Sequence, residues 1–116
     1  MERWHLWYLT ACTSRAHVER PELTFNIFPD NKVVFCTGGA GTICSAQVRA
    51  LVHLGADACI IGRNAEKTER MAADIARARP GARVLGLGDV DVRKPESLQT
   101  AADRCVNELG GIDFVM

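Results

Sequence analysis

One strand–turn–helix stretch decides the fold of this chain: Lys32-Val33-Val34-Phe35-Cys36-Thr37-Gly38-Gly39-Ala40-Gly41-Thr42-Ile43-Cys44. The apolar run at its start is typical of a strand that is buried on both faces. The glycines that follow permit a tight turn and let a pyrophosphate approach the backbone closely. The helix that begins after them offers free N–H groups and the positive end of its dipole. The stretch therefore predicts a phosphate-binding turn between a buried strand and a helix.

The alternation of strand and helix continues to the end of the chain. Each short apolar run is followed by an amphipathic stretch, and crossovers of this length join parallel strands. The predicted strands are 32–36, 58–61, 83–87 and 112–116, and the predicted helices are 43–54, 64–79 and 95–109. The predicted fold class is α/β, the front half of a Rossmann-type doubly wound parallel sheet in the order βαβαβαβ. Its ligand site is expected at the carboxyl ends of the strands, near the first one.

The spacing of apolar residues predicts which helix faces are buried. In the first helix we expect one face to lie against the sheet beside Val34 and Ile60, and it consists of Ile43, Ala46, Ala50, Leu51 and Leu54. In the second helix the predicted stripe is Met71, Ala72, Ile75 and Ala78. In the third helix it is Leu98, Ala101, Ala102, Cys105, Val106 and Leu109. On the wet side of the second helix, Arg70 is expected to pair with Glu66 and with Asp74.

Length and charge exclude several classes of protein. A chain of 116 residues is the size of one ordinary domain. Its 14 basic and 14 acidic residues cancel, so binding of nucleic acid through bulk positive charge is not expected. No window of about 18 uncharged apolar residues is present, so no membrane span or membrane partner is predicted.

The five cysteines are odd in number and contain no C-x-x-C pair. Cys36, Cys59 and Cys105 lie in apolar stretches and are expected to be buried, reduced thiols. Cys44 is expected to be a close-packing helix residue, and a reactive thiol at the helix N-terminus is the alternative. The histidines share no metal-ligand spacing with the cysteines, so no metal site is predicted.

Two glycine patterns can be aligned with the turn. Gly39-Ala40-Gly41-Thr42-Ile43-Cys44 reads as G-x-G-x-x-G with a cysteine at the last position. In T-G-x-x-x-G-x-G, Thr37 and Gly38 match, while Thr42 and Cys44 replace the later glycines. The second pattern is favoured because its Thr-Gly pair follows the strand directly. The predicted cofactor-binding residues of the turn are Thr37, Gly38, Gly39, Gly41, Thr42 and Ile43.

The end of the second strand indicates which dinucleotide is bound. Gly62 stands where a carboxylate would hold the ribose of NAD. Arg63 follows at once and can grip a 2′-phosphate with two N–H groups, which favours NADP(H). The alternative is that Arg63 is a solvated loop charge. Asn64 is expected both to cap the next helix and to belong to the cofactor site.

The end of the third strand offers a site for adenine. Asp91 is expected to accept a hydrogen bond from the adenine amino group, with Val92 covering the ring. Asp89 is the alternative acceptor. Neither acid is expected to be catalytic.

These residues resemble the short-chain dehydrogenase/reductase family, from about Lys32 to Met116. Within it, the run 32–44 with its Thr-Ile-Cys ending is similar to the peroxisomal 2,4-dienoyl-CoA reductases of fungi, as are the runs 91–95 and 111–113. The resemblance implies NADPH-dependent reduction of a 2,4-dienoyl-CoA to a 3-enoyl-CoA in the β-oxidation of unsaturated fatty acids. It also implies an acyl-CoA substrate, homo-oligomers and a peroxisomal location, although no targeting signal is visible and a cytoplasmic location is the alternative.

The same resemblance implies that the catalytic residues lie beyond Met116. Tyr8 is the only tyrosine, and Cys12 stands four residues after it, so no Tyr-x-x-x-Lys is present. We therefore expect residues 31–116 to be the NADP(H)-binding half-domain of an N-terminal fragment that ends in its fourth strand and is inactive alone. The alternatives are a non-catalytic nucleotide-binding fragment or another member of the family. A methyltransferase-like protein is disfavoured, because that class would have an acid at Gly62.

Residues 1–30 differ from the rest of the chain, since they hold five of its seven aromatic residues. We expect a poorly ordered extension. An exposed aromatic patch that docks a partner is the alternative.

Overall fold

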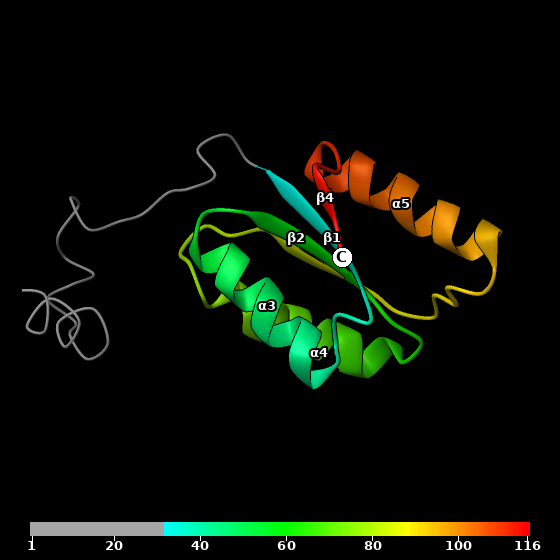
Figure 1. Cartoon of the computed structure of the whole chain (residues 1–116), viewed down its shortest axis with the longest axis horizontal. Coiled ribbons are helices and arrows are strands. Elements are labelled where there is room, and N and C mark those ends of the chain that lie inside the picture. The colour runs from blue at the N-terminus through cyan, green and yellow to red at the C-terminus, as the bar shows by residue number, and fades with distance from the viewer. Residues whose placement is uncertain (1–31) are drawn as a thin grey trace, which may run out of the picture.

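The structure is a computed structural model, and it describes residues 32–116 (Figure 1). Its elements in chain order are β1 (Val33–Thr37), α3 (Thr42–His53), β2 (Asp57–Ile61), α4 (Ala65–Ala76), β3 (Val84–Leu87), α5 (Pro95–Leu109) and β4 (Phe114–Val115). Strands and helices alternate as the sequence predicted, with ends that differ by a few residues. The expectations for residues 1–30 lie outside the described residues.

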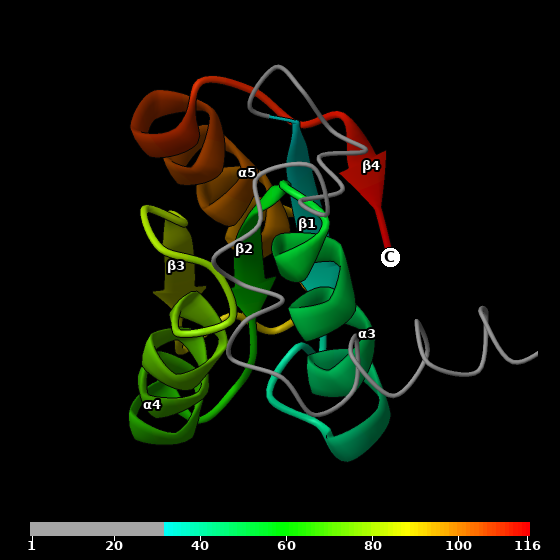
Figure 2. The same ribbon diagram turned by 90° about the vertical axis from the view of Figure 1, so that its left-hand side faces the viewer.

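The four strands form one parallel sheet in the order β3-β2-β1-β4. β1 lies in the middle, and its Val33 and Thr37 align with Asp57 and Ile61 of β2. Figure 2 shows α3 and α4 on one face of the sheet and α5 on the other. The predicted α/β fold, a Rossmann-type doubly wound sheet, is thereby confirmed. From β1 to β3 each new strand is added on the same side of the sheet, whereas β4 is added on the other side of β1. The topological switch point, where the order of strand addition changes side, therefore lies beside β1.

The sheet separates two apolar cores because successive residues of a strand point to opposite faces. Under α3 and α4 the buried core consists of Cys36, Val48, Val52, Ala58, Ile60, Ala72 and Ile75. Under α5 it consists of Val33, Phe35, Cys59, Ile61, Leu87, Val90, Ala101, Cys105 and Leu109. The middle strands β1 and β2 therefore contribute to both cores.

The predicted buried face of α3 is wrong. Ile43 is 74% exposed, and Ala46 and Ala50 also face solvent. The helix instead buries Ser45, Val48 and Val52, with Leu51 and Leu54 partly covered. Residues 45, 48 and 52 also recur with helical spacing, so α3 has a second face that can be buried, and its Val48 and Val52 pack in one cluster with Cys36, Ala58 and Ile60.

The other two helices follow the prediction more closely. Ala72 and Ile75 of α4 are buried, and Met71 and Ala78 pack against them. On α5 only Val106 departs from the predicted stripe, at 46% exposed. Arg70 pairs with Glu66 at 2.6 Å. The expected Arg70–Asp74 pair is wrong, because Asp74 faces α3 and pairs with Arg49 instead.

Gly86 in the middle of β3 explains how close α4 lies to the sheet. A Cβ at this position would stand 2.9 Å from both Ala72 Cβ and the Thr68 carbonyl oxygen. A side chain here would push the helix away, so the glycine that weakens the strand in isolation is required by packing.

The cysteines within residues 32–116 are placed as predicted, with Cys36, Cys59 and Cys105 buried and Cys44 partly buried. Burial, together with the neighbouring Cys44, raises the pKa of the Cys36 thiol to about 11. Burial also raises the pKa of Cys59 and of Cys105. These thiols stay protonated near neutral pH and act as small apolar side chains.

Candidate cofactor site

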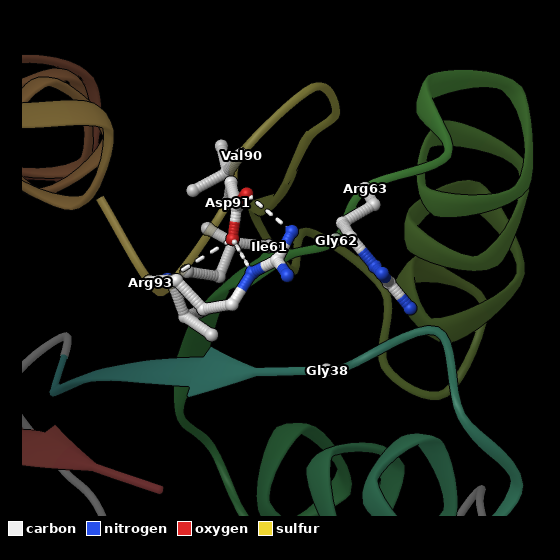
Figure 3. Close-up of a pocket in the computed structure, with 8 residues that line it drawn as sticks. Gly38, Ile61, Gly62, Arg63, Val90, Asp91 and Arg93 are labelled. Carbon is white, nitrogen blue, oxygen red and sulfur yellow. Dashed lines mark hydrogen bonds and ion pairs between the residues drawn. The ribbon is translucent and has the colours of Figure 1, made fainter.

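A pocket of about 290 Å³ opens at the carboxyl ends of the strands, and we call it the strand-end pocket (Figure 3). Its lining residues are Gly38, Ile61, Gly62, Arg63, Val90, Asp91, Val92 and Arg93. They come from the last residue of β2 and from the loops that follow β1, β2 and β3. This is the edge of a doubly wound sheet at which ligands bind, next to the switch point.

The glycine turn after β1 forms one wall of the pocket. Gly38 adopts φ +64°, a left-handed conformation that favours glycine. Its carbonyl accepts the Gly41 N–H at 2.9 Å, which closes the turn. Gly39 has a different role, because a Cβ there would lie 2.4 Å from Ile60 Cβ on β2. The turn therefore requires glycine at position 38 for its backbone conformation and at position 39 for close packing against β2.

The N-terminus of α3 follows the turn directly. Gly41 is the N-cap residue, and the first helical bond of α3 joins the Ser45 N–H to the Gly41 carbonyl at 3.0 Å. The N–H groups of Thr42 and Ile43 have no acceptor within the helix, as at any helix start. The first turn carries no acidic side chain, and both residues are exposed. This end of α3 can accept a phosphate group, in keeping with the predicted role of the turn.

Two predicted site residues turn away from the pocket. The Thr37 hydroxyl and backbone N–H both donate to the Met116 carbonyl, at 3.1 and 2.9 Å, so this side chain joins β1 to β4. Asn64 Oδ1 accepts the Lys67 N–H at 2.9 Å and caps α4. The pocket brings together Gly38, Arg63, Asp91 and Val92 from the predicted set, and the roles of all ten predicted residues stay predictions.

Gly62 adds no acid to the strand-end pocket, and its contact with α4 gives the reason. A Cβ at Gly62 would stand 2.5 Å from Thr68 Oγ1. Thr68 is buried, and its hydroxyl donates to the Asn64 carbonyl at 2.7 Å. A carboxylate at position 62 would therefore require α4 to be repacked.

Arg63 and Arg93 are the two cations of the strand-end pocket. Arg63 is exposed and makes no hydrogen bond or ion pair to any residue between 32 and 116. Arg93 is bound to Asp91, whose Oδ1 accepts the backbone N–H and Nε of Arg93, both at 3.0 Å. Asp91 Oδ2 accepts Nη2 at 2.9 Å. The charge of Arg93 is balanced by Asp91, whereas the charge of Arg63 has no partner within residues 32–116. The pocket therefore carries one net positive charge, which is that of Arg63.

The Asp91–Arg93 contact changes the chemistry of both groups. Hydrogen bonds from the Arg93 side chain and backbone lower the pKa of Asp91 to about 2. The same contact raises the pKa of Arg93. Arg93 was not among the residues predicted from the sequence. The Asp-x-Arg spacing is a signal that could have found it, since aspartate often accepts the N–H two residues ahead of it.

Comparison with known proteins places this geometry in a family. The family model described as short chain dehydrogenase matches residues 32–116. The chain belongs to the short-chain dehydrogenases. The match covers every residue that the structure describes, from β1 through the glycine turn to β4.

This short-chain dehydrogenase is similar to proteins of known activity. A peroxisomal 2,4-dienoyl-CoA reductase of Saccharomyces cerevisiae, which produces (3E)-enoyl-CoA, is 48% identical over 86 residues, covering 73% of this chain and 30% of that protein. The chain therefore spans about a third of the length of that relative.

Solved structures of the family show both forms of the dinucleotide. An NAD⁺-bound xylitol dehydrogenase matches with a TM-score of 0.66 at 26% identity, over 74% of this chain and 33% of that one. An alcohol dehydrogenase from the archaeon Thermococcus sibiricus, complexed with 5-hydroxy-NADP, matches at 0.65 and 27%, over 72% of this chain and 35% of that one. The fold alone does not select between the two forms, so the residues of the pocket must do so.

The residues of this short-chain dehydrogenase fit such a dinucleotide. The glycine turn and the start of α3 can hold the pyrophosphate, and the strand-end pocket can hold the adenosine half. Asp89, the alternative adenine acceptor, does not line that pocket. It adopts φ +57° and lines a separate hollow of about 270 Å³ between the end of β3 and α5.

Among the helices of residues 32–116, none is long and apolar enough to cross a membrane. In the same residues, no three His, Cys, Asp or Glu side chains are grouped so that they could hold a metal ion.

Proposed function

We propose that this chain is the cofactor-binding part of an NADPH-dependent 2,4-dienoyl-CoA reductase in the β-oxidation of unsaturated fatty acids. The likeness to the yeast reductase supports the substrate class, because the chain is 48% identical to that enzyme over 86 residues. A (3E)-enoyl-CoA-producing peroxisomal reductase of Danio rerio is also similar, at 30% identity over 100 residues. An acyl-CoA substrate, a homo-oligomeric state and a peroxisomal location belong to the same proposal.

The observation that carries the choice of NADPH is the unpaired Arg63 beside Gly62. A 2′-phosphate needs a cation whose N–H groups are not engaged elsewhere, and Arg63 is such a group within the described residues. Gly62 adds no negative charge that would repel the phosphate. Thr68 supports this reading, because its hydroxyl fills the space in which an acid at position 62 would begin.

The cofactor and the residues of this chain would have different roles in the reaction. When bound, the dinucleotide would supply a hydride to the dienoyl group. The residues of this chain would bind and orient that cofactor: the turn after β1 would hold its pyrophosphate, and Arg63 its 2′-phosphate. No catalytic residue is assigned within this chain, and we expect the chain alone to bind NADPH without reducing a 2,4-dienoyl-CoA.

The test compares two cofactors on two variants. Arg63→Ala is expected to weaken NADPH by about 10- to 150-fold, the value of one charge-assisted contact, and NADH by less than about threefold. Arg70→Ala is the matched control, because Arg70 is an exposed arginine of α4 that pairs only with Glu66 in the described residues. Dissociation constants come from fluorescence titration of the full chain. Equal weakening of both cofactors by Arg63→Ala would remove the support for NADPH.

A further inference from the structure

We propose that Cys36 and Cys44 are a redox-active pair that closes into a disulfide across the glycine turn, and that this bond weakens dinucleotide binding. The formation of the bond is independent of the proposed function, whereas its effect on the dinucleotide rests on that function. Cys36 belongs to β1 and Cys44 to the first turn of α3. The two cysteines therefore flank the residues that would hold the pyrophosphate.

The two thiols are neighbours on the side of the sheet that α3 and α4 cover. Cys36 is fully buried in the core there, and Cys44 packs against that core from the start of α3. Besides burial, the adjacent Cys44 thiol raises the pKa of Cys36, to about 11. The chain between them is held in a tight turn, in which the Gly41 N–H donates to the Gly38 carbonyl at 2.9 Å. A disulfide between them therefore needs only a local movement.

Exposure decides which thiol reacts first. Within residues 32–116, Cys44 is the one cysteine that is not buried, so a small reagent reaches it before the others. Cys36 stays protonated near neutral pH and lies inside the core, where the reagent does not reach it. Cys59 and Cys105 are also neighbours, but both are fully buried on the opposite face of the sheet. They provide an internal comparison, because proximity is present there without access.

The oxidant in this proposal is a low-molecular-weight disulfide, R–S–S–R. The Cys44 sulfur loses its proton and attacks one sulfur of the reagent, whose S–S bond breaks, and the first R–SH leaves with that proton. The Cys36 sulfur then attacks the Cys44 sulfur, the mixed disulfide breaks, and the second R–SH leaves with the Cys36 proton. The two protein thiols lose two electrons in total, and the reagent gains them.

The bond is expected to move the start of α3 and not β1. A disulfide holds its two sulfurs about 2 Å apart, closer than two thiols in contact. β1 is paired with a strand on each side, and a Cβ at Gly39 would lie 2.4 Å from Ile60 Cβ, so the strand end has no room to shift. The first turn of α3 has no side-chain cap to hold it. The disulfide therefore draws this turn toward β1 and displaces the N–H groups of Thr42 and Ile43.

The first experiment asks whether the bond forms. The full chain is held in mixtures of 2-hydroxyethyl disulfide and 2-mercaptoethanol, which are small and uncharged. The remaining thiols are alkylated in denaturant, and the chain is cut with trypsin. Cleavage after Lys32 and Arg49 leaves both cysteines of the pair in one peptide, 33–49. We expect this peptide to lose two hydrogen atoms and to carry no alkyl group, while Cys59 and Cys105 are alkylated.

Three results of the peptide map would overturn the pair. Peptide 33–49 with an alkyl group on each cysteine would show that no bond forms. A mercaptoethanol adduct on Cys44 beside an alkylated Cys36 would show that the second step does not occur. A disulfide that joins this peptide to Cys12 would show a different pairing. Cys105→Ala is the matched control from the buried pair and is expected to leave the bond in peptide 33–49 unchanged.

The second experiment measures what the bond does to the cofactor. The reduced and oxidised chains are titrated with NADPH and with NADH, which share the same pyrophosphate. The disulfide is expected to weaken both by the same factor, about 10-fold, the value of one hydrogen bond to a charged group. Linkage is reciprocal, so bound NADPH is expected to lower the fraction of disulfide at a fixed reagent ratio. Cys44→Ala is expected to bind each dinucleotide equally before and after treatment with the reagent.

The outcomes separate this inference from the function on which its second half rests. Equal affinities of the reduced and oxidised chains would overturn the effect on the cofactor. A loss confined to NADPH would place the effect at the 2′-phosphate and not at the glycine turn, which would also overturn it. If the reduced chain binds neither dinucleotide, the proposed function fails and the effect on the cofactor fails with it, whereas the peptide map still decides whether the disulfide forms.

Discussion

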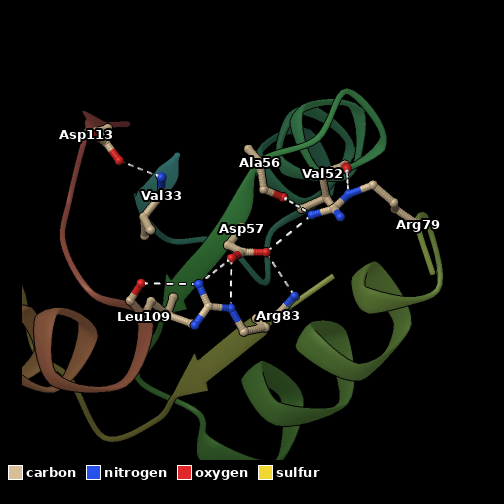
Figure 4. Close-up of polar contacts among 8 residues, drawn as sticks. All are labelled: Val33, Val52, Ala56, Asp57, Arg79, Arg83, Leu109 and Asp113. Atoms are coloured by element: carbon tan, nitrogen blue, oxygen red, sulfur yellow. Dashed lines mark hydrogen bonds and ion pairs between the residues drawn. The ribbon is translucent and has the colours of Figure 1, made fainter. Parts of the chain in front are cut away.

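Three contacts join the Asp57 carboxylate to Arg83, one at its main chain and two at its side chain. Asp57 Oδ1 accepts the Arg83 backbone N–H at 3.0 Å, Oδ2 accepts Nε at 2.9 Å, and Oδ2 forms an ion pair with Nη2 at 2.8 Å. Figure 4 shows this contact at the starts of β2 and β3, with Arg79 approaching the same carboxylate. Arg79 Nη2 donates to Asp57 Oδ1 at 3.2 Å and to the Ala56 carbonyl at 3.2 Å, and its Nε donates to the Val52 carbonyl at 3.0 Å. The carboxylate thereby holds β2, β3 and the end of α3 together. This cluster lies at the amino ends of the strands, opposite the strand-end pocket.

Asp57→Asn is expected to lower the free energy of unfolding by about 2 kcal/mol. Removing one member of a buried ion pair costs about 3–5 kcal/mol, and the partial exposure of the two arginines reduces that cost here. Chemical denaturation followed by circular dichroism measures the change. Asp74→Asn is the matched control, because the Asp74–Arg49 pair is about half exposed, and it is expected to cost less than about 1 kcal/mol. Equal losses in the two variants would contradict the role of Asp57.

Gly39→Ala is expected to destabilise the fold by about 2–3 kcal/mol, because its new Cβ would meet Ile60 Cβ at 2.4 Å and the Ile60 backbone at 3.3 Å. Gly111→Ala is the control, since nothing lies within 4 Å of a Cβ there, and its effect is expected within about 0.5 kcal/mol. The measurement is the shift of the denaturation midpoint at constant slope. A Gly39→Ala chain as stable as the Gly111→Ala chain would show that β1 and β2 can separate more easily than their packing implies.

Gly62→Ala and Thr68→Ala are expected to be coupled. Gly62→Ala alone is expected to cost about 1–3 kcal/mol, because its Cβ would lie 2.5 Å from Thr68 Oγ1. With Thr68→Ala that oxygen is gone, and the nearest remaining atom, the residue 68 Cβ, would be 3.8 Å away. The double variant should therefore be about 1 kcal/mol more stable than the sum of the single effects predicts. If the loss of unfolding free energy in the double variant equals the sum of the losses in the two single variants, the predicted collision is contradicted.

The same coupling shapes any attempt to change the cofactor preference. Gly62→Asp would place a carboxylate near the ribose position that we propose, but it would also meet Thr68. The variant should therefore be made together with Thr68→Ala, so that a change in NADH affinity is not confused with a change in stability.

Protonation of Asp91 is expected only in strong acid. Arg93 lowers the folded-state pKa of Asp91 to about 2, below the ordinary value of 3.8. The stabilising contact is therefore fully present above the ordinary pKa and is lost as the pH falls through the folded value. A carbon-detected NMR titration of the Asp91 carboxyl should give a midpoint near 2, which should rise toward 3.8 in Arg93→Ala. A midpoint unchanged by Arg93→Ala would mean that the pair does not persist in solution.

The candidate site shows how far local sequence signals reach. Arg63 and the glycine turn could be predicted, because each lies directly after a strand and local order alone places it at the carboxyl edge of the sheet. Thr37 and Asn64 satisfy the same local rule, yet one bonds to the Met116 carbonyl and the other caps α4. The Met116 partner of Thr37 is distant in the sequence and is not revealed by local spacing, whereas the capping role of Asn64 was predicted from its place before the helix and is confirmed. Arg93 was not predicted, although its partner Asp91 lies only two residues away and the Asp-x-Arg spacing signals the contact.

The sequence by itself determined the order of strands and helices and the position of the phosphate-binding turn. Apolar periodicity and glycine preference are properties of a few neighbouring residues, so they can be recognised without the fold. Only the tertiary structure decided which side of α3 is buried. Both the face with Ile43 and the face with Val48 have helical spacing, and the choice depends on which side chains fill the space above Cys36, Ala58 and Ile60. Hydrophobicity favours burial of either face, whereas close packing accepts only the one whose shape fits the sheet.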